Sequence, residues 1–230
     1  MKLRDRFAEL AGKYKHAWVF LYILIYMPWF LWLEKHVTTH YHVIQIRLDE
    51  QIPFIEYFII PYLMWFLFIA VVFLYFFFTD VKGFYKLAAF MFTGMTVFLI
   101  ISTVFPNGQD LRPVVFERDN IFVDMVRTLY RTDTCTNVFP SLHVFNSLSV
   151  CAAVADSEAL KKHRGVCIGI YVLAGLIILA TIFLKQHSVL DVLGAGALAG
   201  ILYQFVYAPD RRRAPGYAGQ RRKRPLLQNK

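Results

Sequence analysis

Long apolar runs separated by polar segments dominate the 230-residue chain. A helix needs about 20 predominantly apolar residues to cross the hydrocarbon core of a bilayer. Six runs approach this length and are expected as membrane spans, at residues 17–33, 54–78, 87–105, 140–156, 166–184 and 188–207. The pattern predicts an all-α, polytopic membrane protein whose single six-helix domain covers residues 17–208.

The longest polar segment, residues 106–139, lies between the third and fourth expected spans. It opens with a turn-rich stretch and continues with an amphipathic stretch from about 120 to 130. In the amphipathic stretch, polar side chains recur at helical spacing opposite an apolar face. The polar set is Asp124, Arg127 and Arg131, and the apolar set is Phe122, Val123, Val126 and Tyr130. We expect a helix here that lies along the membrane surface.

The formal net charge of +9 is concentrated at the two ends of the chain. Residues 1–15 hold five Lys and Arg against two acids, and residues 209–230 hold eight against one. Basic segments beside membrane spans are retained on the cytoplasmic side. We therefore expect a basic cytoplasmic N-terminus (residues 1–16) and a basic, flexible cytoplasmic tail (residues 209–230). The arginine runs of the tail would also suit nucleic acid, but adhesion to anionic lipid headgroups is simpler, so no nucleic-acid partner is predicted.

Six spans place both termini on one membrane face and bring three connectors together on the other. The links at 80–86 and 157–165 are rich in Lys and Arg, and they fall on the cytoplasmic face as the positive-inside rule requires. The extracytoplasmic connectors are residues 34–53, 106–139 and 185–188. His143 and His187 are therefore expected at the same end of the bundle.

Cysteine and histidine spacing gives little support for a cross-link or a metal. Three cysteines, an odd number, provide no disulfide framework. His36 and His40 are spaced to share one helix face and to bind a metal. No Cys or paired carboxylate completes such a site in the sequence, so no metal or other cofactor is predicted.

The stretch from Asn137 to His143, with the sequence Asn-Val-Phe-Pro-Ser-Leu-His, closes the polar segment and opens the fourth span. Pro140 suits the first helical position, because its missing N–H would be unpaired there anyway. The N–H groups of Ser141, Leu142 and His143 then face outward at the positive end of the helix dipole, where phosphate is a common occupant. His143 can exchange a proton with a phosphate ester. The alternative is that Pro-Ser only starts the helix and His143 packs at the interface.

His187 and Asp191 are four residues apart and would share one face of a helix. A carboxylate that accepts a hydrogen bond from one ring nitrogen leaves the other nitrogen free to act as a nucleophile. The alternative is that Asp191 simply faces water at the interface. Arg112 offers a planar fork for a phosphate, and Lys185 offers a second positive charge, although both residue types are also common as solvated side chains.

Together these motifs resemble the type-2 phosphatidic acid phosphatase superfamily, which shares its site with vanadium haloperoxidases. The family pattern is Lys-x₆-Arg-Pro, then Pro-Ser-Gly-His, then Ser-Arg-x₅-His-x₃-Asp. The matching residues are Arg112-Pro113, Pro140-Ser141-Leu142-His143 with Leu142 in place of the glycine, His187 and Asp191. Order, spacing and placement all fit, and the resemblance covers roughly residues 54 to 208.

Three departures from that pattern stand out. Phe105 occupies the position of the first lysine, and Ala180 and Thr181 replace the Ser-Arg pair. Two phosphate-holding cations of the family are therefore missing, and Lys185 is the candidate for a partial replacement. The Phe-Pro-Ser-Leu-His form and the reduced third motif look more like the branch that contains inositol phosphorylceramide and sphingomyelin synthases.

The resemblance implies roles for individual residues. His187 would attack phosphorus and form a phosphohistidine, Asp191 would orient it, and His143 would protonate the leaving oxygen and then activate water or an alcohol. Arg112, Lys185 and the N–H groups of Ser141 and Leu142 would hold the phosphoryl oxygens. Asn137, Asp133 and Asp110 lie near enough in sequence to contribute, and no metal is implied.

The expected function is that of an integral membrane lipid phosphatase acting on phosphatidate, another lipid phosphate or a polyprenyl diphosphate. The alternative is a lipid headgroup phosphotransferase that uses the same His/His/Asp site. A non-catalytic lipid binder or transporter is a third class, and the nearly uncharged span centres disfavour it as a solute path. The small size is similar to bacterial members, so a bacterial cell membrane with an extracytoplasmic site is expected. The partners are the bilayer and a lipid substrate, and the oligomeric state is left open.

Overall fold

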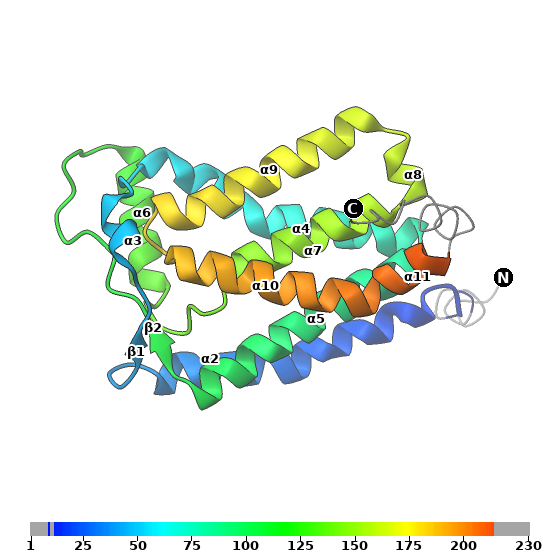
Figure 1. The fold of residues 1–230 in the computed structure, drawn as a ribbon, viewed down its shortest axis with the longest axis horizontal. Helices are drawn as coiled ribbons and strands as arrows, with labels where there is room; N and C mark the ends of the chain where they lie inside the picture. The colour runs from blue at the N-terminus through cyan, green and yellow to red at the C-terminus, as the bar shows by residue number, and fades with distance from the viewer. Residues whose placement is uncertain (1–8, 10–11, 214–230) are drawn as a thin grey trace, which may run out of the picture.

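The chain forms a bundle of long helices that run side by side (Figure 1). The computed structural model describes residue 9 and residues 12–213, with side chains up to residue 210. The long elements are η1 (Lys15–Tyr22) continuing into α2 (Ile23–His36), η2 (Glu56–Phe58) continuing into α4 (Ile59–Thr79), α5 (Val81–Val104), α7 (Leu142–Asp156), α9 (Arg164–Phe183) and α10 (Val189–Val206). All of these except α7 are long and apolar enough to cross a membrane, which makes five candidate spans among the described residues.

The shortest of the long helices, α7, lies in the middle of the bundle. It contacts α4, α5, α9 and α10, and at 15 residues it is roughly 22 Å long. The rings of Phe90 and Phe145 stack between α5 and α7 with their centroids 5.4 Å apart. Gly94 makes this approach possible, because a Cβ atom there would overlap the Phe145 ring. α7 is therefore a core helix, and its first turn is reached from one end of the bundle.

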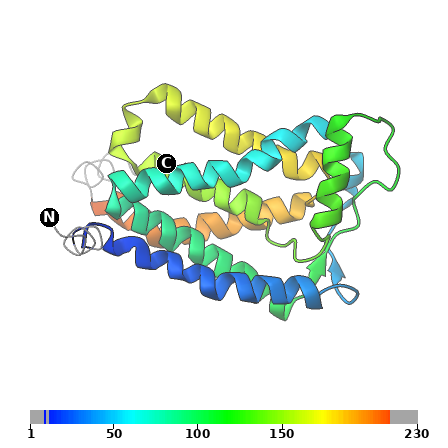
Figure 2. The same cartoon turned by 180° about the vertical axis from the view of Figure 1, so that it is seen from behind.

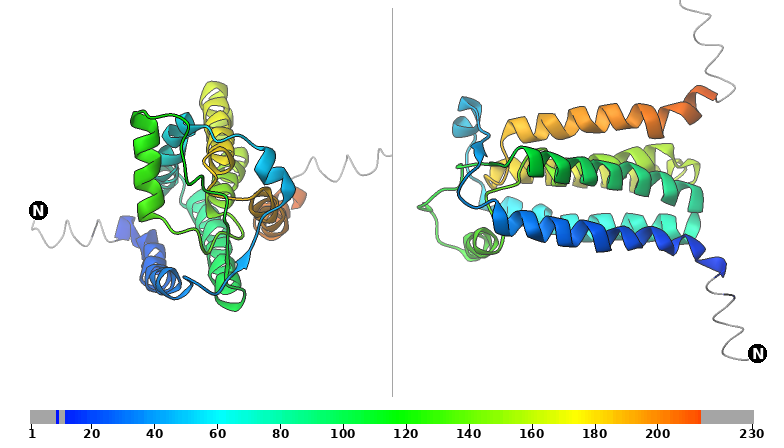
Figure 3. Two further views of the ribbon diagram at one scale, coloured as in Figure 1. Left: turned by 90° about the vertical axis from the view of Figure 1, so that its left-hand side faces the viewer. Right: turned by 90° about the horizontal axis from the view of Figure 1, so that it is seen from below.

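That end, called here the histidine end, is covered by short elements from the connectors. They are α3 (Arg47–Gln51), α6 (Ile121–Thr132) and a parallel pair of two-residue strands, β1 (His42–Val43) and β2 (Asn107–Gly108). α6 lies across the ends of the long helices (Figures 2 and 3). It starts where the Asn120 side chain accepts hydrogen bonds from the N–H groups of Phe122 and Val123, and it buries Val123 and Val126. The amphipathic helix predicted from the sequence is confirmed.

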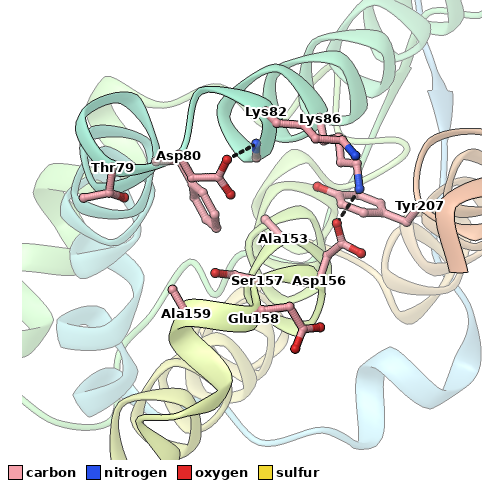
Figure 4. Close-up of a pocket in the computed structure, with 12 residues that line it drawn as sticks. Thr79, Asp80, Lys82, Lys86, Ala153, Asp156, Ser157, Glu158, Ala159 and Tyr207 are labelled. Carbon is pink, nitrogen blue, oxygen red and sulfur yellow. Dashed lines mark hydrogen bonds and ion pairs between the residues drawn. The ribbon is translucent and has the colours of Figure 1, made fainter. Parts of the chain in front are cut away.

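The opposite end holds α8 (Glu158–Lys161), α11 (Ala208–Arg213) and the α4–α5 junction. A cavity of about 420 Å³ lies there between the α4–α5 junction, the end of α7, the start of α8 and Tyr207 (Figure 4). Lys86 Nζ lies 2.6 Å from Asp156 Oδ2 and 2.9 Å from Asp210 Oδ2. Lys82 approaches the same Asp210 oxygen at 3.1 Å. The ammonium groups of Lys86 and Lys82 lower the pKa of Asp210 to about 2. This end is held together by pairs of charged side chains.

The structure corrects the predicted helix boundaries at three places. The polar link expected at 80–86 is helical, because Asp80 alone separates α4 from α5 and its side chain caps the new helix by accepting the N–H of Gly83 at 2.9 Å. The first span, expected at 17–33, extends over Lys15–His36. The predicted tail at 209–230 begins within α11, and its remainder, like most of the predicted N-terminal segment 1–16, lies outside the described residues.

Candidate active site at the histidine end

The turn between α9 and α10 carries His187. Lys185 has a φ of 52°, in the left-handed region, which ends α9 and reverses the chain direction. The N–H groups of Gln186 and His187 both donate to the carbonyl oxygen of Thr181. Ser188 then caps α10, where its Oγ accepts the N–H of Leu190. The turn is thus tied to the helix before it and to the helix after it.

His187 and Asp191 form the pair predicted from their spacing. Nδ1 of His187 lies 3.2 Å from Oδ2 of Asp191, which also accepts the N–H of Ser188 at 2.9 Å. Both residues are buried, with 8% and 0% of their surface exposed. Because a carboxylate only accepts hydrogen bonds, Nδ1 is the donor, and in the neutral form of the ring Nε2 then has the lone pair. No described residue bonds to Nε2, which leaves it available as a nucleophile.

The start of α7 lies directly against the start of α10. The Asn107 side chain accepts the N–H groups of Val138 and Phe139, at 2.9 and 2.8 Å, and so holds the approach to the helix. α7 begins at Leu142 with Ser141 as its N-cap, so Pro140 precedes the helix instead of occupying its first turn. The N–H of Ser141 is not free as predicted, because it donates to the carbonyl of Asp191 at 3.2 Å.

The first turn of α7 still offers two N–H groups. Those of Leu142 and His143 lie outside the ladder of hydrogen bonds within the helix, as the first N–H groups of any helix do. They carry the positive end of the helix dipole. They therefore remain available to an anion beside His143.

His143 faces His187 across the site, with ring centroids 5.8 Å apart and 58° between the ring planes. Two aromatic rings of α4 flank it, Tyr62 at 4.5 Å and Trp65 at 4.3 Å. No described residue hydrogen-bonds to either of its ring nitrogens. Both histidines thus have ring nitrogens without a partner at the same end of the bundle, as the topology predicted.

Arg112 binds the polypeptide backbone. Its two terminal nitrogens donate to the carbonyls of Tyr130, Asp133 and Thr134 and to the side-chain oxygen of Gln186. The three carbonyls belong to the last turn of α6 and the residues just after it, where carbonyl groups lack partners within the helix. Only Nε of Arg112, which is buried, has no partner among the described residues.

Lys185 also binds backbone groups. Its ammonium group donates to the carbonyls of Asp49 and Ile52, at the end of α3. Burial lowers the pKa of Lys185, and the charge of Asp49 opposes this effect. Both cations predicted for the phosphate therefore contact main-chain carbonyls in this structure.

The other predicted residues line the rim of the site. Asn137 has a φ of 55° and donates to Glu34 at 2.8 Å. The Asp133 carboxylate lies 3.5 Å from the hydroxyl of Tyr62, and burial raises its pKa against the opposing charges of Arg112 and His187. Asp110 is exposed. The structure thus brings Asp133 close to the histidines and places Asp110 on the surface.

Sequence reasoning missed several residues that contact the predicted ones, among them Asp49, Tyr62, Trp65 and Gln186. Gln186 had a signal, since it precedes His187 directly. Asp49, Tyr62 and Trp65 had none, because the predicted residues they contact lie 71 or more residues away along the chain. Buried donors without a partner among the described residues include Nε of Arg112, Nε2 of Gln186 and Nε1 of Trp65. Each belongs to a residue that contacts a predicted site residue, and buried donors normally have a partner, so each is a candidate donor to a bound anion.

The chain matches no protein-family model, no curated protein and no solved structure. Among the described residues, no group of three His, Cys, Asp or Glu side chains is placed to hold a metal ion. His36 instead stacks on Trp32 and bonds to its carbonyl oxygen, and His42 stacks on Phe105.

Proposed function

We propose that the protein is an integral membrane enzyme that removes the phosphate of a lipid phosphate through a phosphohistidine on His187. The observation that carries this proposal is the pair of facing histidines, one of them paired with a buried carboxylate. A neutral imidazole with Nδ1–H held by a carboxylate and Nε2 free is the form needed for nucleophilic attack. The resemblance to type-2 phosphatidic acid phosphatases assigns the same residues to the same roles.

The reaction would take two displacements at phosphorus. In the first, Nε2 of His187 forms a bond to phosphorus, the bond from phosphorus to the lipid oxygen breaks, and protonated His143 gives its proton to that oxygen. In the second, His143 takes a proton from water, whose oxygen attacks phosphorus and releases phosphate from His187. Asp191 stabilises the positive imidazole ring in both steps.

The phosphoryl oxygens would be held by donors that have no partner among the described residues. These are the first-turn N–H groups of Leu142 and His143, with Nε of Arg112 and the side-chain N–H groups of Gln186 and Trp65. Fixed donors aimed at the transferring group are the main source of catalysis in phosphoryl transfer. In this proposal the Gln and Trp donors replace part of the positive charge that the family pattern would supply.

A second candidate is transfer of a phosphorylated headgroup from one lipid to the hydroxyl of another. One observation favours it: Lys185 and most of the Arg112 donors are occupied by backbone carbonyls. A site with few free cations suits a phosphodiester, which carries one negative charge, better than a phosphomonoester. The chemistry at His187 is the same, and an alcohol replaces water in the second step.

The proposed membrane arrangement has six crossings: the five candidate spans and α7, which is the fourth along the chain and the shortest. The described chain begins and ends at the end opposite the histidines (Figure 1). Because the terminal segments are basic, we assign that end to the cytoplasm and the histidine end to the extracytoplasmic side of a bacterial membrane.

The test is a product assay on purified protein in detergent. Labelled phosphatidate and a labelled phosphodiester lipid are incubated with and without an alcohol acceptor, and the phosphoenzyme is trapped in alkali, where phosphohistidine survives. Release of free phosphate that His187→Ala abolishes and His163→Ala preserves would support the phosphatase, because His163 is exposed at the opposite end. A new phospholipid that forms only with acceptor would support the transferase. No His187-dependent turnover across a wide range of lipid phosphates would refute both.

A further inference from the structure

The short helix α3 interlocks with the turn that carries His187. Asp49 of α3 is 2% exposed, and all the groups that bond to its carboxylate are uncharged. Its Oδ2 accepts the hydroxyl of Ser188 at 2.7 Å and the N–H of Ile46 at 2.7 Å. Its Oδ1 accepts the N–H of Val189 at 2.8 Å. One buried carboxylate thus holds the two residues that follow His187.

The same contact is reinforced from the other direction. Lys185, two residues before His187, donates from its ammonium group to the carbonyls of Asp49 and Ile52. The carbonyl of Lys185 accepts the side-chain N–H of Gln109 at 3.0 Å. The residues on both sides of His187 are therefore fixed to α3. This helix belongs to a different connector, and Asp49 and Ser188 are 139 residues apart along the chain.

The surroundings of Asp49 stabilise its buried charge, and most of its hydrogen bonds go to the turn after His187 and not to α3. The N–H of Val189 belongs to the first turn of α10, where an anionic side chain pairs with unpaired N–H groups and with the helix dipole. Burying a carboxylate is costly unless its oxygens are hydrogen-bonded, and here three N–H or O–H donors meet this requirement. Five residues of helix could not fix a side chain so firmly without these contacts.

We infer that Asp49 is a positioning residue for the reaction. Its carboxylate fixes His187 through Ser188 and Val189, and Lys185 strengthens the same contact by donating to the backbone of α3. This inference rests on the proposed phosphoryl transfer by His187. It gives Lys185 a role different from the predicted phosphate contact, since its ammonium group holds the backbone of α3. A nucleophile displaced by about 1 Å loses on the order of 100-fold in rate, so a small shift of the turn is enough to matter.

The test compares Asp49→Asn and Lys185→Met with Glu50→Gln, an exposed acid on the same helix. The amplitude of the phosphohistidine burst counts the competent sites, so rates can be expressed per site. We expect Asp49→Asn to lower the phosphorylation rate per site about 10- to 100-fold with KM changed less than about threefold. Lys185→Met should lower it less, and Glu50→Gln should match the wild type.

A rate per site equal to wild type in Asp49→Asn would overturn the inference, even if fewer molecules were competent, because that result describes a merely structural role. A second measurement does not depend on turnover: the ¹⁵N signals of His187, assigned by His187→Gln, are recorded in histidine-labelled protein. Asp49→Asn should shift them and Glu50→Gln should not, and unmoved signals would overturn the inference. Wild-type protein without any His187-dependent burst would refute the proposed function instead, and the spectra would then decide the positioning role alone.

Discussion

The two ends of the helical bundle use their charged side chains differently. At the histidine end, Arg112 and Lys185 donate to main-chain carbonyls, and Asp49 accepts a main-chain N–H. At the opposite end, Lys86 pairs with Asp156 (Figure 4). It also pairs with Asp210. Arg112, Lys185 and Asp49 thus bond to backbone groups, beside ion pairs such as Arg118–Glu56 at the same end, whereas Lys86 bonds to two carboxylates.

The reason for this difference lies in the connectors. The histidine end is built from residues 37–55, 105–120 and 133–141, where many backbone groups lie outside helices and need partners. At the opposite end a single residue, Asp80, joins α4 to α5, so few backbone groups are left over. An end made of irregular backbone can present donors to a ligand, whereas an end made of helix termini and ion pairs mainly fastens the bundle.

The largest expected effect is a loss of activity when a residue of the histidine end is replaced. His143→Gln removes the proposed acid and base while keeping a polar side chain of similar reach. We expect kcat to fall about 10²- to 10⁴-fold, which is the usual contribution of a general acid–base group. The measurement is kcat for lipid phosphate turnover in detergent micelles, with the melting temperature as a control. Turnover within about threefold of wild type would remove His143 from the mechanism.

Replacing Arg112 by Lys should reduce stability strongly at the histidine end. One ammonium group cannot reach the four acceptors of the guanidinium, so carbonyls that follow α6 would lose their partners. We expect unfolding to become easier by about 2–4 kcal/mol. Equilibrium unfolding in denaturant measures this, and Arg131→Lys, at an exposed position of α6, is the matched control. Equal stability of the two variants would contradict the structural role of Arg112.

Replacing Lys86 by Met should weaken the opposite end and leave the chemistry unchanged. The side chains of Lys86 and Asp156 are 16% and 20% exposed, so loss of the lysine leaves a largely buried carboxylate unpaired. We expect a loss of roughly 1–2 kcal/mol, while kcat stays within about twofold. Lys82→Met is the control, because Lys82 is 78% exposed and such pairs contribute about 0–1 kcal/mol. A large loss of kcat in Lys86→Met would show that the two ends are coupled.

The smallest expected effect is a loss of local stability at the opposite end when the pH is lowered. The pKa of Asp210 is about 2 in the folded protein against an ordinary 3.8, so its contribution to stability is present above pH 3.8 and is lost as the pH falls toward 2. The protection factors of the α11 amides, which divide the intrinsic exchange rate at each pH by the observed rate, should therefore fall over this range. Asp210→Asn should remove this pH dependence of the protection factors, and an unchanged dependence in that variant would assign it to another group.

The sequence predicted the helical bundle and much of the site. Six apolar runs were expected as spans; five correspond to helices long enough to cross a membrane, and the fourth forms the shorter α7. The spacing of polar and apolar residues from about 120 to 130 located α6. The spacing of His187 and Asp191 predicted a contact that depends on helix geometry alone. The polar link at 80–86 was predicted wrongly, because charged residues beside a span suggest a loop while Asp80 in fact caps a helix that starts at once.

What the sequence determined by itself is local and periodic: which segments are helical, which end of the bundle holds both histidines, and which carboxylate contacts His187. The tertiary structure decided how the charged side chains are used. Arg112 and Lys185 bind carbonyls 18 to 136 residues away, and Asp49 meets Ser188 across 139 residues. No repeat or spacing in the sequence records such pairings, because they arise only when connectors from different spans fold over the same end and each buried backbone group finds a partner.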